Sequence, residues 1–205
     1  MAGSSIRHVI FDMDGVLCRT DFSRRDDEMA QRIGVSAAAI EAAIFKSGFE
    51  HEADQGRFTA EQYLQGMAER LGVAVGRADW IAARKAAMTP NQDMLNLTRA
   101  LGRRVGIAML TNNGPLLRAH IGEIFPQAVE LFGARAFFSC EFGTGKEGTA
   151  VFALLLARIG ATPAATLFID DSADYIDNAR AAGLRVHHFR GIEPLRTQLT
   201  ALGLG

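Results

Sequence analysis

Five short segments in which apolar residues occupy consecutive positions constrain the fold of this chain more than any other feature. They are HVIF at 8–11, VGIAML at 105–110, AFFS at 136–139, TLFI at 166–169 and LRVHHF at 184–189. Strands of this kind suit a parallel sheet covered on both faces, because a strand with one wet face would alternate apolar and polar residues. Helical patterns lie between the later segments, as crossover connections require. The sequence therefore predicts an α/β fold with three layers, a doubly wound parallel sheet between helices.

The first strand segment is not followed directly by a crossover helix. Between Leu17 and Thr89 the pattern is helical throughout, with a capping box at Thr59 and Gln62. We expect these residues to form a helical cap that is inserted into the sheet domain and packs around a small core of its own. The predicted organisation is a core of residues 1–16 and 90–205 and a cap of residues 17–89.

Composition and charge restrict the classes of partner. Hydrophobic residues make up 48% of the 205 residues, enough for a sizeable core, and the net charge of -1 comes without a run of lysine or arginine. A basic footprint for nucleic acid or an anionic membrane is therefore not expected, and no secretory or membrane-spanning segment is recognised. We expect a cytoplasmic protein that binds a small molecule; its oligomeric state is not indicated.

Two acidic pairs follow strand segments. Asp12 and Asp14 end the first, and Asp170 and Asp171 end the fourth. Parallel strands would bring both pairs to one edge of the sheet, where two like charges about 4 Å apart repel by about 4 kcal/mol at an effective dielectric near 20. Such an oxygen-rich cluster suits Mg²⁺ better than Ca²⁺, because no EF-hand spacing is present. The alternatives are a solvated D-x-D-G turn for the first pair and helix capping by Asp171 or Ser172 for the second.

The segment after the VGIAML strand offers groups for an anion. Thr111 provides a hydroxyl, while Asn112, Asn113 and Gly114 provide amides and free backbone N–H groups at the start of a helical region. These residues indicate a phosphate or oxyanion contact, with Asn113 as a further substrate contact. Ordinary turn chemistry is the alternative, since Asn-Asn-Gly is also common in turns.

A lysine between glycines, in FGTGKEGT at 142–149, raises the question of a nucleotide P-loop. The pattern fails twice, because Cys140 stands where the first glycine belongs and Glu147 stands where a hydroxyl must meet magnesium. Lys146 would instead supply the positive charge that lets an anionic ligand approach several carboxylates. An exposed loop lysine is the alternative.

The order of FDMDGV, LTNN, GKEGTAVF and LFIDDSADYIDNARAAGLRVHHF resembles the four motifs of the haloacid dehalogenase superfamily, in the group whose helical cap follows the first strand. The resemblance implies a Rossmann-like core and is greatest to small bacterial phosphatases that act on sugar phosphates and related metabolites. It implies that Asp12 is the nucleophile, which forms an aspartyl-phosphate, and that Asp14 is the general acid and base. Carboxylate crowding is expected to raise the pKa of Asp14 for that role. An acid at this position argues against dehalogenation.

The same resemblance assigns the remaining site residues. Phosphoryl oxygens would be bound by Thr111, Asn112 and Lys146. The implied Mg²⁺ ligands are Asp12, the backbone carbonyl of Asp14, and Asp171, with Asp170 as a supporting acid.

Some positions depart from the family pattern, and others have two alternative roles. Relatives often read K-P-D-P where this chain has Lys146 followed by Glu147, and asparagine where it has Tyr175. His51 and Glu52 belong to an expected cap turn, which would either face the substrate or lie on the surface.

The predicted function is a Mg²⁺-dependent phosphatase for a small phosphorylated metabolite. A phosphomutase of the β-phosphoglucomutase type is the rival enzyme, although the segment RTDFSRRD lacks the histidine expected in such caps. A receiver-like signalling domain also combines aspartates, threonine and lysine, but in a different order. A non-catalytic phosphoryl-binding protein is the remaining alternative.

Overall fold

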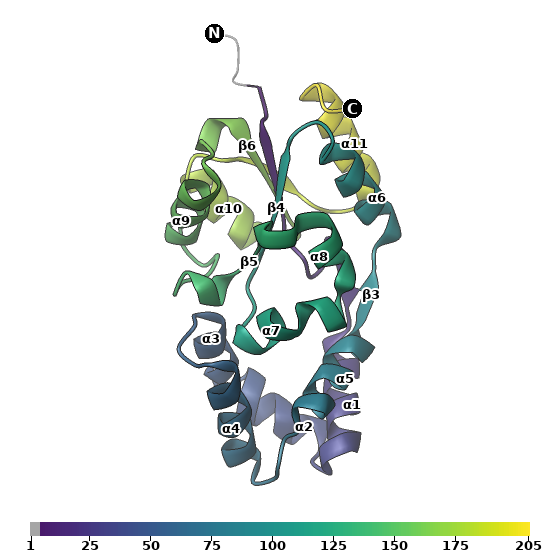
Figure 1. Ribbon diagram of the computed structural model, residues 1–205, viewed down its shortest axis with the longest axis vertical. Helices are drawn as coiled ribbons and strands as arrows, with labels where there is room; N and C mark the ends of the chain where they lie inside the picture. The colour runs from purple at the N-terminus through teal and green to yellow at the C-terminus, as the bar shows by residue number, and fades with distance from the viewer. Residues whose placement is uncertain (1–4) are drawn as a thin grey trace.

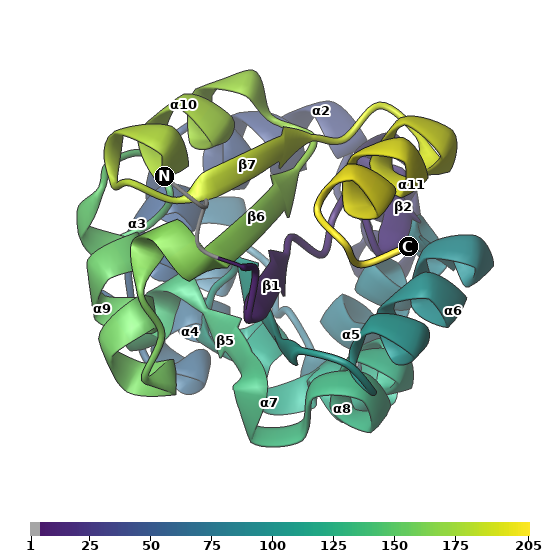
Figure 2. The same cartoon turned by 90° about the horizontal axis from the view of Figure 1, so that it is seen from above.

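A parallel sheet of five strands forms the centre of the computed structural model, which describes residues 5–205. The strands lie in the order β5-β4-β1-β6-β7, and each neighbouring pair is parallel. Their bounds are β1 His8–Phe11, β4 Gly106–Thr111, β5 Ala136–Phe138, β6 Thr166–Asp170 and β7 Arg185–His188. The predicted α/β fold class is confirmed, and the consecutive apolar residues of the inner strands β1, β4 and β6 are explained by helices on both faces (Figure 2).

Alternate residues of β1 pack into different layers. Ile10 belongs to a cluster with α9 and α10, whereas Val9 and Phe11 belong to a larger cluster with α6, α7, α8 and α11. Successive side chains of a strand point to opposite faces, so a central strand needs apolar residues at every position. These helices span Gln92–Leu101 (α6), Pro115–Ile124 (α7), Pro126–Phe132 (α8), Ala150–Ile159 (α9), Ala173–Ala181 (α10) and Ile192–Ala201 (α11).

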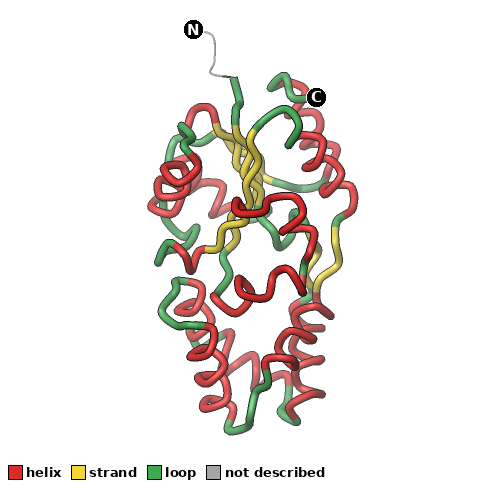
Figure 3. The backbone as a smooth tube through the Cα atoms, in the orientation of Figure 1, coloured by secondary structure: helices red, strands yellow, loops and turns green. Residues whose placement is uncertain are grey.

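The chain between Thr20 and Met88 forms a separate group of helices beyond the carboxyl edge of the sheet (Figure 1). A short antiparallel ribbon of β2 (Cys18–Thr20) and β3 (Met88–Pro90) connects this group to the sheet, and appears yellow beside the red helices in Figure 3. The group contains α1 Phe22–Ile33, α2 Ala37–Ile40, the π-helix η1 Glu41–Phe45, α3 Phe49–Asp54, α4 Ala60–Leu71 and α5 Arg77–Ala87.

Helix α4 shows how local sequence sets the helix ends. The Thr59 hydroxyl accepts the N–H of Gln62 at 3.2 Å, and the Gln62 side chain accepts the N–H of Thr59 at 2.9 Å, so the predicted capping box is confirmed. Gly72 ends the helix with φ of 69°, a left-handed conformation that favours glycine. By contrast, the turn expected around His51 and Glu52 is wrong, because these residues lie in α3.

Three short 3-10 helices complete the described part of the chain: Gly133–Arg135, Ser139–Glu141 and Pro163–Ala165. Among residues 5–205, no helix is both long enough and apolar enough to span a bilayer.

Candidate active site

The carboxyl ends of three adjacent strands bring polar residues to one edge of the sheet. Asp12 follows β1, Thr111 ends β4 and Asp170 ends β6, and these residues are 5%, 1% and 0% exposed. Because β1 lies between β4 and β6, the three side chains converge on its end. Charges in such a buried position interact more strongly than they would in water.

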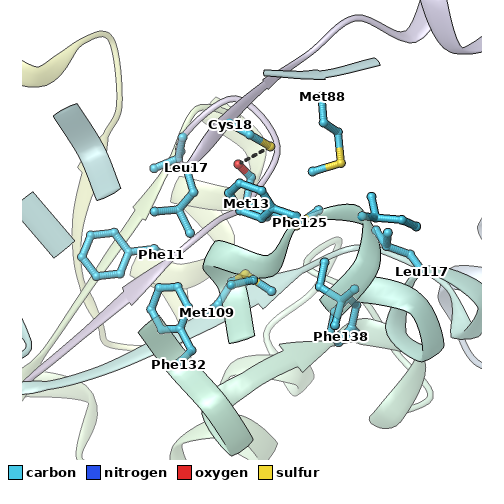
Figure 4. Close-up of a cluster of buried hydrophobic side chains, with 14 of the residues drawn as sticks. Phe11, Met13, Leu17, Cys18, Met88, Met109, Leu117, Phe125, Phe132 and Phe138 are labelled. Carbon is cyan, nitrogen blue, oxygen red and sulfur yellow. Dashed lines mark hydrogen bonds between the residues drawn. The ribbon is translucent and has the colours of Figure 1, made fainter. Parts of the chain in front are cut away.

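The turn after β1 is held by Met13, the residue between the two aspartates of the D-x-D-G motif. Its side chain lies in the hydrophobic cluster of Figure 4, and its carbonyl accepts the N–H groups of Leu17 and Cys18 at 2.9 and 3.0 Å. Gly15 completes the turn with φ of 85°. A Cβ atom at Gly15 would overlap the carboxylate of Asp171, so both the backbone conformation and the close approach require glycine.

Lys146 lies buried between the two acidic pairs. Its Nζ is 2.8 Å from Oδ1 of Asp12 and 2.6 Å from Oδ2 of Asp170. Burial alone would lower the pKa of Lys146, but the two carboxylates outweigh burial and raise the pKa above its ordinary value. The Lys146 N–H donates to Oδ1 of Asn112 at 3.0 Å, and its carbonyl accepts from Nδ2 of Asn178 at 2.9 Å. The alternative of an exposed loop lysine is therefore wrong.

Asp12, Asp170 and Asp171 bring carboxylate oxygens within 4.8 Å of one another. Burial raises the pKa of Asp12 well above its ordinary value; the Lys146 ammonium opposes that rise and the Asp170 carboxylate adds to it. Three carboxylates beside one ammonium leave an excess of negative charge, and hard oxygen donors of this kind suit Mg²⁺. The donor set of this edge therefore fits a divalent cation.

The two residues of the second acidic pair are held differently. Asp170 accepts the N–H of Ser172 at 2.8 Å as well as the Lys146 ammonium, so both of its oxygens are engaged. Asp171 is exposed, and its carboxylate faces the turn at Gly15. Ser172 occupies the N-cap of α10 but its side chain accepts no capping hydrogen bond. Helix capping therefore does not account for this pair.

Asp14 is held by three donors. Nη2 of Arg84 lies 2.9 Å from both of its oxygens, Nδ2 of Asn113 donates at 2.9 Å, and the Thr20 hydroxyl donates to Oδ1. Burial would raise the pKa of Asp14, but Arg84 and the hydrogen bonds hold it below its ordinary value. The expectation that carboxylate crowding raises this pKa is therefore wrong, because Arg84 and the hydrogen bonds outweigh burial.

Arg84 is the most important residue that the sequence interpretation missed. It lies on α5, is 3% exposed, and is 70 residues from Asp14 in the chain. Its signal was present in the pattern, because Trp80 and Ala87 are buried four residues before it and three after it. An arginine on the apolar stripe of a helix needs a buried partner.

Glu147 and Tyr175, the two departures from the family pattern, both contact Asn112. Nδ2 of Asn112 donates to Oε1 of Glu147 at 2.8 Å and to the Tyr175 hydroxyl at 3.3 Å. The Tyr175 ring also lies against Lys146, with Nζ 4.8 Å from the ring centroid. The side-chain amide of Asn112 is thus occupied within the protein, and both departures help to fix the loop that carries the lysine.

The loop after β4 is tied to its surroundings through Asn113. Its Nδ2 donates to the Thr111 hydroxyl at 2.7 Å as well as to Asp14, and its N–H donates to the Ser139 hydroxyl at 3.1 Å. That hydroxyl in turn donates to the carbonyl of Asp54 on α3 at 2.6 Å. One hydrogen-bonded chain therefore connects the sheet edge with the helical group.

Two cavities meet at Asp14. The first, which we call the aspartate cavity, has a volume of about 500 Å³, and its lining includes Asp12, Asp14, Thr111, Lys146 and Asp171. The second, which we call the inner cavity, lies between the helical group and α7 and has a volume of about 170 Å³. Its lining includes Asp14, Asn113, Glu50, Asp54 and Arg84.

His51 and Glu52, the substrate contacts expected from the helical segment, are both exposed on α3 and line neither cavity. Glu50 and Asp54, one turn apart on the same helix, line the inner cavity instead. Nδ1 of His51 lies 3.9 Å from Oε1 of Glu147, at the surface. The residues of α3 that line a cavity are therefore Glu50 and Asp54 rather than His51 and Glu52.

The sequence and the fold of this chain both resemble those of known proteins. A family model described as haloacid dehalogenase-like hydrolase matches residues 6–183. Phosphatase MT3486 from Mycobacterium tuberculosis (strain CDC 1551 / Oshkosh) is 26% identical over 192 residues, which cover 89% of this chain and 87% of that protein.

Two solved structures share the fold. A predicted HAD-like family hydrolase from Porphyromonas gingivalis has a TM-score of 0.81 and 21% identity, over 96% of this chain and 98% of that one. A HAD family enzyme from Bacteroides thetaiotaomicron, crystallised with magnesium and inorganic phosphate, has a TM-score of 0.76 and 20% identity, over 93% and 98%.

Proposed function

The chain belongs to the haloacid dehalogenase-like hydrolase family, and we propose that it is a Mg²⁺-dependent phosphatase that hydrolyses a small phosphomonoester, a sugar phosphate or related metabolite. The observation that carries this proposal is the buried contact of Lys146 with Asp12, 2.8 Å long, beside two further carboxylates. A carboxylate nucleophile that is held against an ammonium and a cation site suits attack on phosphorus.

The first chemical step in this proposal takes place at Asp12. A carboxylate oxygen of Asp12 attacks phosphorus, the bond from phosphorus to the substrate oxygen breaks, and an aspartyl-phosphate forms. The leaving oxygen takes a proton from Asp14. Lys146 offsets negative charge on the phosphoryl oxygens, and the buried Thr111 hydroxyl offers a further contact to them.

The second step returns the enzyme to its starting state. Asp14 removes a proton from a water molecule, the water oxygen attacks phosphorus, and the bond to Asp12 breaks to release inorganic phosphate. The contacts of Asp14 with Arg84 and Thr20 favour its carboxylate form, which is the form that this step needs. For the first step the Arg84 contact must weaken, so that Asp14 carries a proton when the alcohol leaves.

Mg²⁺ would be held by Asp12, the backbone carbonyl of Asp14, and Asp171, with Asp170 supporting Lys146. When bound, it supplies the positive charge that lets an anionic carboxylate approach an anionic phosphate. The magnesium and phosphate in the Bacteroides thetaiotaomicron enzyme support this assignment.

The helices between β2 and β3 are proposed to act as a cap. In this proposal residues 17–89 form the cap over a core of residues 1–16 and 90–205, and the β2–β3 ribbon is the connection about which the cap moves. Closure would exclude water from the aspartate cavity while the phosphoryl group is transferred.

Phosphate release from p-nitrophenyl phosphate tests the proposal. We expect turnover with Mg²⁺, its loss in a chelator, and a fall on the order of 10⁴-fold or more in Asp12→Asn. Asp93→Asn, an exposed aspartate on α6, is the matched control and should retain turnover. Activity that persists in Asp12→Asn would refute the nucleophile. Conversion of a hexose 1-phosphate into an isomer, without free phosphate, would replace the phosphatase by the phosphomutase.

A further inference from the structure

The inner cavity is placed to receive the part of a substrate that leaves with its oxygen. Asp14, the proposed acid, belongs to the lining of both cavities, so a phosphomonoester in the aspartate cavity would direct its alcohol past Asp14. The cavity volume of about 170 Å³ is smaller than the roughly 300 Å³ at which pockets for drug-sized ligands begin. In this conformation its size therefore suits a group no larger than a single sugar.

Two polar atoms of the cavity lining are buried without a hydrogen-bond partner. They are Nη1 of Arg84 and Oδ1 of Asp54. Arg84 is 3% exposed, and its other terminal nitrogen already holds Asp14. Buried donors and acceptors are nearly always paired in folded proteins, so these two atoms of one small cavity are available to hydrogen-bond a ligand.

The charges around the inner cavity disfavour a charged ligand. A carboxylate there would meet the carboxylate of Asp14, and an ammonium would meet the guanidinium groups of Arg84 and Arg25. The charged side chains are largely satisfied within the protein: Arg84 by Asp14, Arg25 by Asp26 at 2.8 Å, and Glu50 by a hydroxyl of the neighbouring helix α4. A neutral ligand would leave these pairs intact.

Asp54 complements a hydroxyl group in particular. Burial, reinforced by the charge of Glu50, raises its pKa to about 9, so that its carboxyl group is protonated at neutral pH and both donates and accepts hydrogen bonds. Arg84 offers only donors. The rings of Trp80 and Tyr63 add apolar surface beside these polar groups, as expected for a site that covers the C–H face of a sugar or polyol.

We infer that the inner cavity is the leaving-group site of the proposed phosphatase, and that Asp54 and Arg84 select a small, uncharged alcohol with several hydroxyl groups. This inference rests on the proposed function. It assigns to α3 and α5 a role in choosing the substrate, and makes Arg84 the residue that connects hydroxyl recognition with Asp14.

A panel of four phosphomonoesters tests the substrate class. Phosphate release is measured for a hexose 1-phosphate, O-phosphoserine, phosphoglycolate and a nucleoside monophosphate. We expect kcat/KM for the hexose phosphate to exceed the other three by at least about 10-fold, the effect of one well-placed hydrogen bond to a charged or buried group. Equal or better turnover of an ester with a charged or a larger leaving group would overturn the inference while leaving the phosphatase intact. Release from no ester would refute the proposed function, and the inference with it.

Two variants of Asp54 test the residue. Asp54→Leu removes the hydrogen-bonding group, whereas Asp54→Asn keeps one donor and one acceptor of similar shape. We expect kcat/KM for the hexose phosphate to fall about 10- to 100-fold in Asp54→Leu, mostly through KM, and to be largely restored in Asp54→Asn. Turnover of p-nitrophenyl phosphate, whose leaving group has no such hydroxyls, should fall by a smaller factor.

Asp27→Leu, an exposed position on α1, is the matched control for the substitution. Thermal unfolding of each variant identifies misfolded protein. If Asp54→Leu unfolds at the temperature of the wild type and keeps the full preference for the hexose phosphate, Asp54 does not recognise the hydroxyl groups of the substrate. Equal losses in Asp54→Leu and Asp54→Asn would likewise contradict the assignment, because they would indicate a need for the carboxyl group itself.

Discussion

The acidic edge of the sheet and the inner cavity are both buried and charged, but they are completed in different ways. At the sheet edge the Lys146 ammonium lies within 2.8 Å of Asp12 and within 2.6 Å of Asp170. In the inner cavity Nη1 of Arg84 and Oδ1 of Asp54 have no partner within the described chain. The groups proposed for phosphoryl transfer are thus held in place by one another, whereas the groups proposed to bind the alcohol are available to a ligand.

Lys146→Met removes the ammonium group that contacts Asp12 and Asp170 at the sheet edge, and should have the largest effect. It leaves Asp12 and Asp170 buried without their cation, and removing one partner of a buried ion pair costs about 3–5 kcal/mol. We expect the free energy of unfolding to fall by that amount and turnover of p-nitrophenyl phosphate to fall on the order of 10³-fold or more. Urea unfolding and phosphate release measure the two effects. Lys85→Met, an exposed lysine on α5, is the control, and equal behaviour of the two variants would contradict the role of the buried contact.

Gly15→Ala tests whether the sheet edge depends on the close approach of the Gly15 backbone to the Asp171 carboxylate. The residue has φ of 85°, and an alanine Cβ would overlap Asp171, so we expect a loss of Mg²⁺ affinity on the order of 10- to 100-fold. Gly34→Ala separates the two causes, because Gly34 has φ of 71° but open space around the added atom. It should show only the backbone strain, about 1 kcal/mol of stability. If turnover depends on the magnesium concentration in the same way in Gly15→Ala and Gly34→Ala, the close approach of Gly15 to Asp171 does not matter for magnesium binding.

Arg84→Met tests the residue that joins the two regions. Asp14 keeps its hydrogen bonds from Thr20 and Asn113, so we expect a moderate loss of stability, about 1–3 kcal/mol. The kcat for a hexose phosphate should fall about 10- to 100-fold, with an altered pH profile, since Asp14 loses its charged partner. Arg77→Met on the same helix removes only an exposed pair with Glu61 and should change stability by less than about 0.5 kcal/mol. An unchanged kcat and pH profile in Arg84→Met would show that Arg84 does not influence the chemical step through Asp14.

The pH dependence of stability tests whether Asp54 in the inner cavity is protonated in the folded protein. The folded protein raises the pKa of Asp54 to about 9, so its contribution to stability is complete below the ordinary aspartate pKa and is lost as the pH rises toward 9. The free energy of unfolding of the wild type should therefore decline with pH more steeply than that of Asp54→Asn, by up to about 1.4 kcal/mol per pH unit. Urea unfolding at pH 6, 7 and 8 measures the slopes. Parallel slopes would show that Asp54 is not held in its protonated form.

Much of the sheet edge could be predicted because the signals are local. Consecutive apolar residues mark a strand covered on both faces, and the residues that follow Phe11, Leu110 and Ile169 must then lie at the carboxyl edge. Helix α3 was missed because it is only six residues long, between Gly48 and Gln55, and half of its residues are acidic. Its buried apolar face consists of Phe49 and Ala53 alone, which is too short a stripe for a sequence pattern to detect.

The sequence by itself determined the sheet, the positions of the two acidic pairs and the glycine turn at Gly15, because each follows from the residues within one strand or turn. The tertiary structure alone decided that Glu50 and Asp54 rather than His51 and Glu52 face the inner cavity. It also decided that Asp14 has a lowered pKa, because Arg84 reaches it from 70 residues away. Burial and charge pairing are properties of neighbours in space, and those neighbours are fixed only when the helical group packs against the edge of the sheet.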